Sequence, residues 1–130
     1  MNLFFYMSRT NGKGADLLRA VVSLVSAGSL EVFPDLHSFN RRIRKPKNSF
    51  TVSLIWNPTK EDLREIGAMR EFLAGTRILL ILPNQDEEMV ALAHRILPTY
   101  IAYVDDGVSE IVAVLDRLMK TRKTLPATLS

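Results

Sequence analysis

Five short apolar runs are spread along the chain, and each is followed by a segment with helical spacing of its apolar residues. The runs are rich in β-branched and aromatic residues, which is typical of buried strands. We therefore expect strands at 3–6, 30–33, 50–58, 78–82 and 100–104. The central run reads FTVSLIWNP, and its last three residues, Trp56-Asn57-Pro58, end the strand.

The segments between these runs predict amphipathic helices. The expected helices cover 15–26, 35–43, 60–74, 89–97 with an acidic start at 84–88, and 109–120. Asp35 and Thr59 are expected N-caps, and Asp62 lies three residues after Thr59, as in a capping box. Gly28 and Gly75 are expected to end helices. Residues 1–121 form the predicted domain, and 122–130 a tail or linker.

Strands that alternate with helices predict an α/β fold, the flavodoxin-like (βα)5 three-layer sandwich with a five-stranded parallel sheet in the order 2-1-3-4-5. In such a sheet, ligands bind at the carboxyl ends of the strands. The residues that end the central strand should therefore indicate the function. They are Ile55, Trp56 and Asn57, and none of them is an obvious nucleophile, acid or base.

The composition limits the range of functions. At 130 residues, with 47% hydrophobic and 24% charged residues, the chain predicts one soluble globular domain. The lack of cysteine excludes disulfides and thiol catalysis and is compatible with the cytoplasm, where we expect the protein. No apolar run reaches the ~20 residues that span a bilayer, and residues 1–7 lack the basic leader of a signal peptide. The formal charge of +3 permits an acidic partner without demanding nucleic acid.

Over residues 1–121 the layout resembles the receiver domain of bacterial response regulators, of the chemotaxis-regulator type. The most specific match is Ile55-Trp56-Asn57-Pro58, because receivers end strand three with an aspartate that is followed shortly by a proline. Here Ile55 stands in the place of the aspartate, and the proline comes one residue early. Residues 76–85 resemble the fourth receiver strand and its exit, and Tyr103 resembles the aromatic residue of the fifth.

The resemblance implies a phosphoacceptor pocket that has lost its chemistry. Receivers hold Mg²⁺ with an acidic pair after strand one, and bind the phosphoryl group through a hydroxyl after strand four and a lysine after strand five. The matching positions fall near Met7 and Ser8, near Leu82 and near Asp106. Together with Ile55, Trp56 and Asn57 they form a degenerate pocket. We expect a pseudo-receiver that is not phosphorylated in the usual way, with no metal site and no cofactor.

Pseudo-receivers are generally protein-interaction modules, so the resemblance implies a non-enzymatic role in two-component signal transduction. In receivers the helix 4, strand 5, helix 5 face is the usual contact surface, often of a homodimer, and here it would span 87–118. The residues expected on this interaction face are Glu87, Val90, Ala91, His94, Tyr103, Ile111 and Leu115. The same residues could equally be ordinary solvated surface.

The loop between the first strand and helix offers an alternative. It reads Ser8-Arg9-Thr10-Asn11-Gly12-Lys13-Gly14, and backbone N–H groups at such a turn can hold a phosphate. The loop is similar to the phosphate loop of flavodoxins, with Ser8, Thr10, Asn11, Gly12 and Lys13 as binding residues and Trp56 stacked on a flavin. The final threonine of that loop is missing, and the glycine spacing does not match a Walker motif. A plain strand-to-helix turn is the other interpretation.

Three remaining features carry weaker hypotheses. The basic run Arg41 to Lys47 could bind an acidic partner, but it has no interleaved aromatic residues, and we do not expect nucleic-acid binding. His37 and His94 lie on different helices and make a poor metal site. Asp105-Asp106 could serve an enzyme of another α/β class, although turn chemistry before Gly107 explains both residues.

Overall fold

The fold is an α/β three-layer sandwich built on a parallel sheet. The structure is a computed structural model that describes residues 1–8, 12–47 and 50–120. Its sheet has the strand order β2-β1-β3-β4-β5, with every neighbouring pair parallel. The strands are β1 (Asn2–Tyr6), β2 (Leu30–Phe33), β3 (Thr51–Trp56), β4 (Arg77–Leu82) and β5 (Tyr100–Tyr103). This confirms the predicted flavodoxin-like class and strand order.

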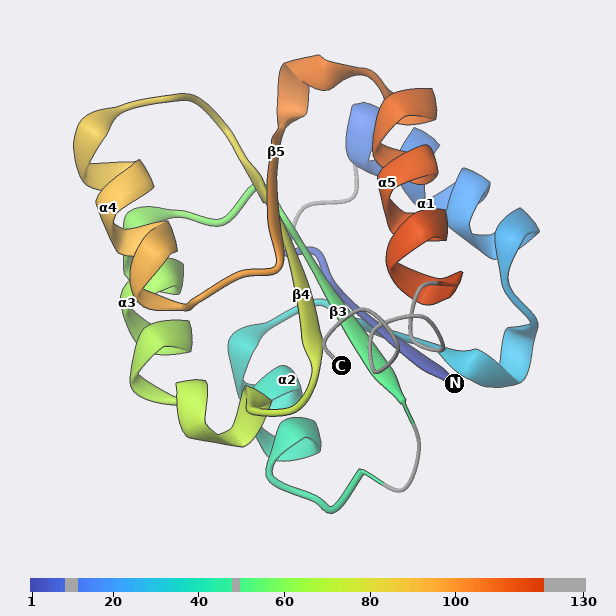
Figure 1. The fold of residues 1–130 in the computed structure, drawn as a ribbon, viewed down its shortest axis with the longest axis horizontal. Coiled ribbons are helices and arrows are strands. Elements are labelled where there is room, and N and C mark those ends of the chain that lie inside the picture. The colour runs from blue at the N-terminus through green and yellow to red at the C-terminus, as the bar shows by residue number, and fades with distance from the viewer. Residues whose placement is uncertain (9–11, 48–49, 121–130) are drawn as a thin grey trace, which may run out of the picture.

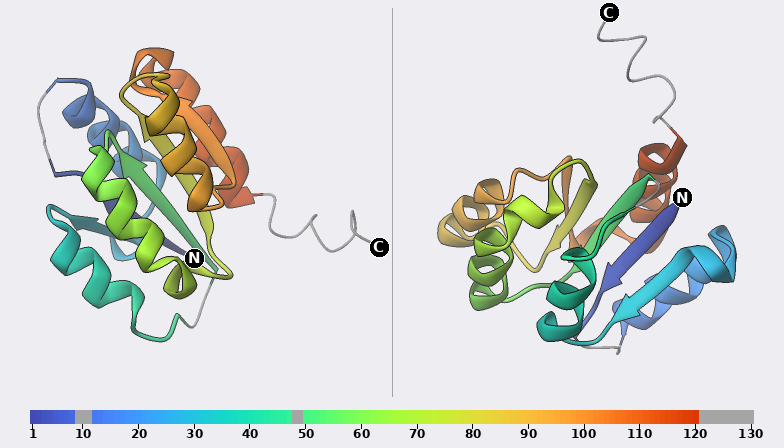
Figure 2. Two further views of the ribbon diagram at one scale, coloured as in Figure 1. Left: turned by 90° about the vertical axis from the view of Figure 1, so that its left-hand side faces the viewer. Right: turned by 90° about the horizontal axis from the view of Figure 1, so that it is seen from below.

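Helices cover both faces of the sheet (Figures 1 and 2). α1 (Lys13–Leu24) and α5 (Val108–Lys120) pack on one face, and α2 (Leu36–Ile43), α3 (Lys60–Ala68) and α4 (Glu87–Arg95) on the other. Because side chains alternate along a strand, the sheet separates two cores. Leu54 and Trp56 point into the α1–α5 core, while Ile55 points into the α2–α3–α4 core.

Three helices end earlier than the hydrophobic spacing predicts, and one of them is α4, which was expected to reach residue 97 but ends at Arg95. The prediction for the first helix was 15–26, but α1 begins at Lys13 and ends at Leu24, so Gly28 plays no part in stopping it. The third was expected to run to residue 74, but α3 ends at Ala68 and a 3-10 turn, Arg70–Leu73, follows. The N–H of Met69 is shared between the carbonyl oxygens of Glu65 and Ile66, which tightens the chain into that turn.

Both predicted N-caps are present. A side-chain oxygen of Asp35 accepts a hydrogen bond from the N–H of Ser38 at 2.7 Å. The Thr59 hydroxyl accepts from the N–H of Asp62 at 3.0 Å, and the Asp62 carboxylate accepts from the N–H of Thr59 at 3.1 Å, which completes the capping box. These bonds satisfy N–H groups that a helix start would otherwise leave unpaired, so α2 and α3 begin at defined residues.

Three of the five cations in the predicted basic run make contacts within the fold: Arg42, Arg44 and Lys47. Arg42 forms an ion pair with Glu31 at 3.0 Å. The guanidinium of Arg44 lies 4.4 Å from the ring centre of Phe72, a cation–π distance. Lys47 donates to two backbone carbonyl oxygens, and burial is the main cause that lowers its pKa. Most of the run therefore stabilises the fold rather than offering a free basic stripe.

In the described ranges no helix is both long enough and apolar enough to cross a membrane.

Removal of the Thr59 hydroxyl should destabilise the protein through α3. We expect Thr59→Ala to lower the free energy of unfolding by about 1 kcal/mol, because it leaves the N–H of Asp62 without its acceptor. Urea denaturation followed by circular dichroism measures the change. Ser23→Ala is the matched control, since the Ser23 hydroxyl only donates back to the carbonyl of Arg19 within the last turn of α1. An equal loss in both variants would contradict the role of the cap.

Candidate functional site

The carboxyl edge of the sheet, where an α/β protein normally binds its ligand, is filled by apolar side chains. Met7, Ile55 and Leu82 are fully buried there, and Trp56 is 4% exposed. The resemblance to receivers implied metal-binding, phosphate-accepting and phosphate-contacting groups at or near these positions. The structure brings them together at one edge, but as packed core rather than as a polar pocket.

Trp56 closes the edge on the α1 side by packing against the start of that helix. A Cβ atom placed on Gly14 would lie 2.8 Å from Nε1 of Trp56 and 3.0 Å from Sδ of Met7. Side chains essentially never approach so closely, so α1 can rest on the indole only because residue 14 has none. The indole is covered by α1 and cannot present an open face to a flavin in this arrangement.

Tyr6 and Leu82 close the edge on the other side of the sheet, where both belong to the same core as Ile55. Burial is the largest cause that raises the pKa of the Tyr6 hydroxyl from 10.0 to about 12, and the negative charge of Asp62 raises it further. Tyr6 is therefore held in its neutral form.

Asn57 turns the chain away as soon as β3 ends. Its φ is 51°, in the left-handed region that asparagine tolerates better than most residues. Its N–H donates to the carbonyl of Ile81 at 2.7 Å, which continues the pairing of β3 with β4 for one more residue. Asn57 thus serves to terminate the strand and lead into the α3 cap.

The carboxylates near this edge have structural partners. Besides Asp35 and Asp62, Asp86 caps α4 by accepting from the N–H of Met89 at 3.2 Å. Asp106, which the resemblance matches to the receiver lysine, accepts from the N–H of Tyr103 at 2.8 Å. No group of three or more His, Cys, Asp or Glu side chains within residues 1–8, 12–47 and 50–120 is placed to hold a metal ion.

The predicted phosphate loop is only partly described. Thr10 and Asn11 lie outside the described residues, as does Arg9. Ser8 is exposed, and Gly12 has a φ of 56° and offers no side chain to cap α1. The ammonium of Lys13 lies 3.4 Å from the carbonyl oxygen of Val104 and 3.9 Å from the Asp105 carboxylate, so it links α1 to the loop after β5.

Helices α3 and α4 are joined by charged side chains. The Lys60 ammonium lies 3.2 Å from Asp86 and 2.9 Å from Glu88, and a guanidinium nitrogen of Arg64 lies 3.1 Å from the other Glu88 oxygen. The hydrogen bond to Glu88 is the first cause that raises the pKa of Lys60, and the bond to Lys60 is the first that lowers the pKa of Glu88. All four side chains are substantially exposed, so each pair contributes little by itself.

The predicted interaction face is smaller than expected. Glu87, Ala91 and His94 are exposed on α4, while Val90 and Tyr103 are half-buried. For the other two residues the prediction of a surface position is wrong, because Ile111 is 1% exposed and Leu115 is fully buried. Both point from α5 into the core against the sheet, so their side chains cannot contact a partner in this structure.

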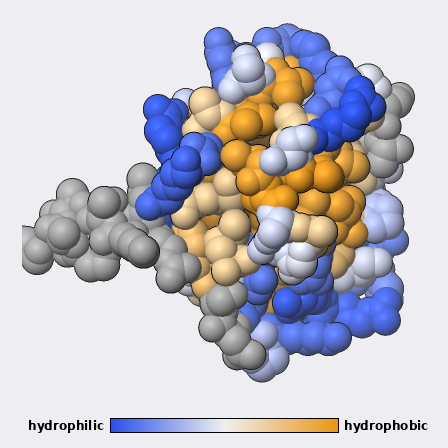
Figure 3. Space-filling view, turned by 90° about the vertical axis from the view of Figure 1, so that its right-hand side faces the viewer, coloured by the Kyte–Doolittle hydropathy of each residue, from blue (hydrophilic) through white to orange (hydrophobic). Residues whose placement is uncertain are grey.

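A second surface, outside the predicted face, is rich in apolar side chains. Figure 3 shows an extended apolar patch on the side of the molecule covered by α1 and α5. On this side Val22 is 55% exposed and Leu24 is 37% exposed, and Leu18 and Val25 are half-buried beside them. Contiguous apolar surface of this kind marks contact sites in soluble proteins.

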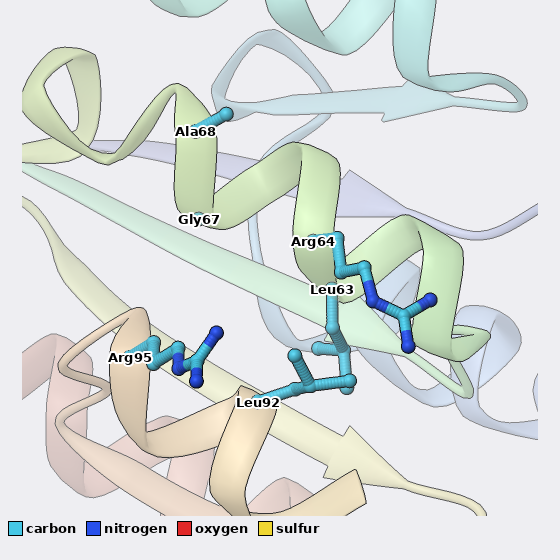
Figure 4. A pocket seen from close by; sticks show the side chains of 6 residues that line it. All are labelled: Leu63, Arg64, Gly67, Ala68, Leu92 and Arg95. Carbon is cyan, nitrogen blue, oxygen red and sulfur yellow. The ribbon is translucent and has the colours of Figure 1, made fainter. Parts of the chain in front are cut away.

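Figure 4 shows a groove between α3 and α4, which we call the α3–α4 groove. Its volume is about 290 Å³, and its lining residues are Leu63, Arg64, Gly67, Ala68, Leu92 and Arg95. The residue pattern along the chain does not indicate this groove. The helical spacing of the lining residues on each helix was visible in the sequence, but nothing local indicates which helix lies next to which.

Comparison of the chain with protein-family models, with curated proteins and with solved structures found no match.

A methyl group at Gly14 should disturb the closed edge. We expect Gly14→Ala to lower the free energy of unfolding by about 1–3 kcal/mol, because the new Cβ meets Trp56 and Met7. The matched control is Gly67→Ala in α3, where a Cβ meets nothing within 4 Å and should stabilise the helix by about 0.5–1 kcal/mol. Urea denaturation measures both. An unchanged Gly14→Ala protein would show that the indole does not pack as described.

Stability should fall in alkali as Tyr6 ionises. The pKa of Tyr6 is raised in the folded state, so its contribution is complete below pH 10 and is lost as the pH rises toward about 12. We expect Tyr6→Phe to have a smaller loss of melting temperature between those values than the wild type. Thermal melts at stepped pH test this, and parallel curves for the two proteins would contradict it.

Proposed function

We propose that the chain is a non-enzymatic signalling or regulatory module of the receiver type, which acts through protein contacts and is not phosphorylated in the usual way. The observation that carries the proposal is the closed carboxyl edge. Ile55 is fully buried, in register with Tyr6 of β1 and Leu80 of β4, and Trp56 is covered by α1. An alkyl side chain at this place has no atom that can accept a phosphoryl group.

The charges at the edge support the same proposal. Receiver chemistry needs carboxylates that are free to hold Mg²⁺. In the described part of the chain, Asp35, Asp62, Asp86 and Asp106 instead accept hydrogen bonds from backbone N–H groups. Diverting any of them to a metal would remove a helix cap or a turn. The edge therefore serves stability, and function is left to the outer surface of the domain.

The contact surface we propose is the α4–β5 side of the predicted interaction face, used in a homodimer or with another protein of a bacterial two-component pathway in the cytoplasm. Ala91 and His94 are exposed there. Leu97, just after α4, is 69% exposed and has a φ of 58°, and Tyr100 at the start of β5 is 46% exposed. Large apolar side chains held at a sheet edge suit a partner that covers them.

The test of self-association uses two exposed histidines as a matched pair. Sedimentation velocity over a range of concentrations should show a dimer for the wild type and for His37→Glu on α2. His94→Glu should shift the equilibrium toward monomer, because a twofold contact uses the same patch on both subunits and would therefore cover two new charges. A wild type that stays monomeric contradicts the homodimer, and loss in Val22→Glu but not His94→Glu would place the contact on α1–α5.

The claim about phosphorylation is tested separately by amide NMR with Mg²⁺ and beryllofluoride, a mimic of the phosphoryl group. We expect the amides of Ile55, Leu82 and Asp106 to stay where they are. Shifts that cluster at these three residues would overturn the claim that the chemistry has been lost. Shifts at other residues, with none at these three, would be consistent with the claim.

A further inference from the structure

We propose that the α3–α4 groove binds a segment of a partner protein that presents a leucine-sized apolar side chain next to a carboxylate. The proposal stands on the shape and charge of the groove and does not depend on the receiver-like function. It concerns the side of α4 that faces α3, whereas the proposed interaction face lies on the side toward β5.

The groove has an apolar floor and a basic rim. Leu63 and Leu92 form the floor and are almost completely buried, at 1% and 6% exposed. Arg64 and Arg95 stand at the rim on opposite helices, and in Figure 4 their guanidinium groups lie on opposite sides of the two leucine side chains. A ligand that fits must therefore be apolar at its centre and anionic at its edge. At about 290 Å³ the groove is at the small end of binding pockets, so it fits one or two side chains.

The charges around the groove are not balanced. Lys60 is shared between Asp86 and Glu88, and Arg64 takes the second oxygen of Glu88. These contacts pair two cations, Lys60 and Arg64, with two anions, Asp86 and Glu88. Arg95 is a third cation on the same side, and within the described ranges it has no acidic partner. The groove is thus complementary to one additional carboxylate.

Arginine is well suited to this task. Its planar guanidinium offers several N–H donors in a fixed geometry and can bind a carboxylate through two of them. Arg64 uses one nitrogen on Glu88, which leaves other donors for a ligand. A carboxylate set between Arg64 and Arg95 would join the middle of α3 to the end of α4, whereas the existing ion pairs reach α4 only at its start.

Gly67 keeps the groove open. It is the penultimate residue of α3, in the last turn of the helix, where glycine still lowers helix stability, and a Cβ placed on it would meet nothing within 4 Å. The missing side chain costs stability and leaves space on the wall of the groove. Replacement by leucine should fill that space while improving the helix. Binding and folding can therefore be separated at this one residue.

The probe is the peptide acetyl-Leu-Glu-Leu-amide, and its uncharged match is acetyl-Leu-Gln-Leu-amide. In an amide NMR titration at low salt, the glutamate peptide should shift Leu63, Arg64, Gly67, Leu92 and Arg95, and the glutamine peptide should bind about tenfold more weakly. Equal binding of the two peptides, or shifts located elsewhere on the fold, would overturn the proposal.

Two variants complete the experiment. Gly67→Leu should abolish binding of the glutamate peptide while the melting temperature stays the same or rises, so a loss of binding cannot be ascribed to unfolding. Arg95→Gln should weaken the binding of the glutamate peptide about tenfold and leave the binding of the glutamine peptide unchanged. Arg41→Gln on α2, outside the groove, is the control and should bind like the wild type. Binding that survives in folded Gly67→Leu protein would contradict the assignment.

The groove and the proposed function can fail independently. A monomeric protein, or one that responds to beryllofluoride, would remove the receiver-type account without affecting the peptide titration. A peptide that does not bind would remove the groove as a docking site and leave the α4–β5 face and the closed edge as they stand.

Discussion

The contact of the Trp56 indole with Gly14 is the interaction on which the rest of this structure depends. In a parallel α/β sheet the loops that follow the strands separate at the carboxyl edge, and the space between them usually receives a ligand. Here the largest side chain at the end of the central strand lies in the core under α1, with Met7 beside it. The opening is closed from within, and the helix is positioned by the same contact that closes it.

This closure changes what polar residues near the edge do. Asp35, Asp62 and Asp86 begin helices, Asp106 holds a turn, and Lys13 links α1 to the loop after β5. The four aspartates act through local hydrogen bonds and Lys13 through a bond between distant segments, and none of these contributions requires a ligand. The features available for function lie on the outer surface, away from the carboxyl edge of the sheet. They are the exposed residues of α4 and β5, the apolar side of α1 and α5, and the α3–α4 groove.

The parts of the structure that depend on local chemistry were predictable from the sequence. Strand positions followed from short apolar runs, and Asp35 and Thr59 were identified as caps because capping depends on residues three apart. The end of α3 was predicted wrongly, because the bifurcated hydrogen bond at Met69 that tightens the turn has no signature in residue spacing.

Assignment of surface residues needed the third dimension. Ile111 and Leu115 were placed on the interaction face by resemblance, but the structure buries both of them in the core between α5 and the sheet. The burial of Trp56 depends on the absence of a side chain at Gly14, which is far away in sequence. The α3–α4 groove exists because α3 and α4 lie side by side and Gly67 has no side chain to fill the space between them. The sequence of one helix does not show which other helix lies next to it.

Fluorescence of the single tryptophan tests the central claim most directly, because Trp56 reports on the closed edge without any mutation. The account predicts a blue-shifted emission in the native protein and strong protection from quenching by acrylamide, with both lost in urea. The result should be the same with and without added flavin mononucleotide. Native emission at the wavelength of the unfolded chain, with equal quenching in both states, would show that the edge is open and that the account is wrong.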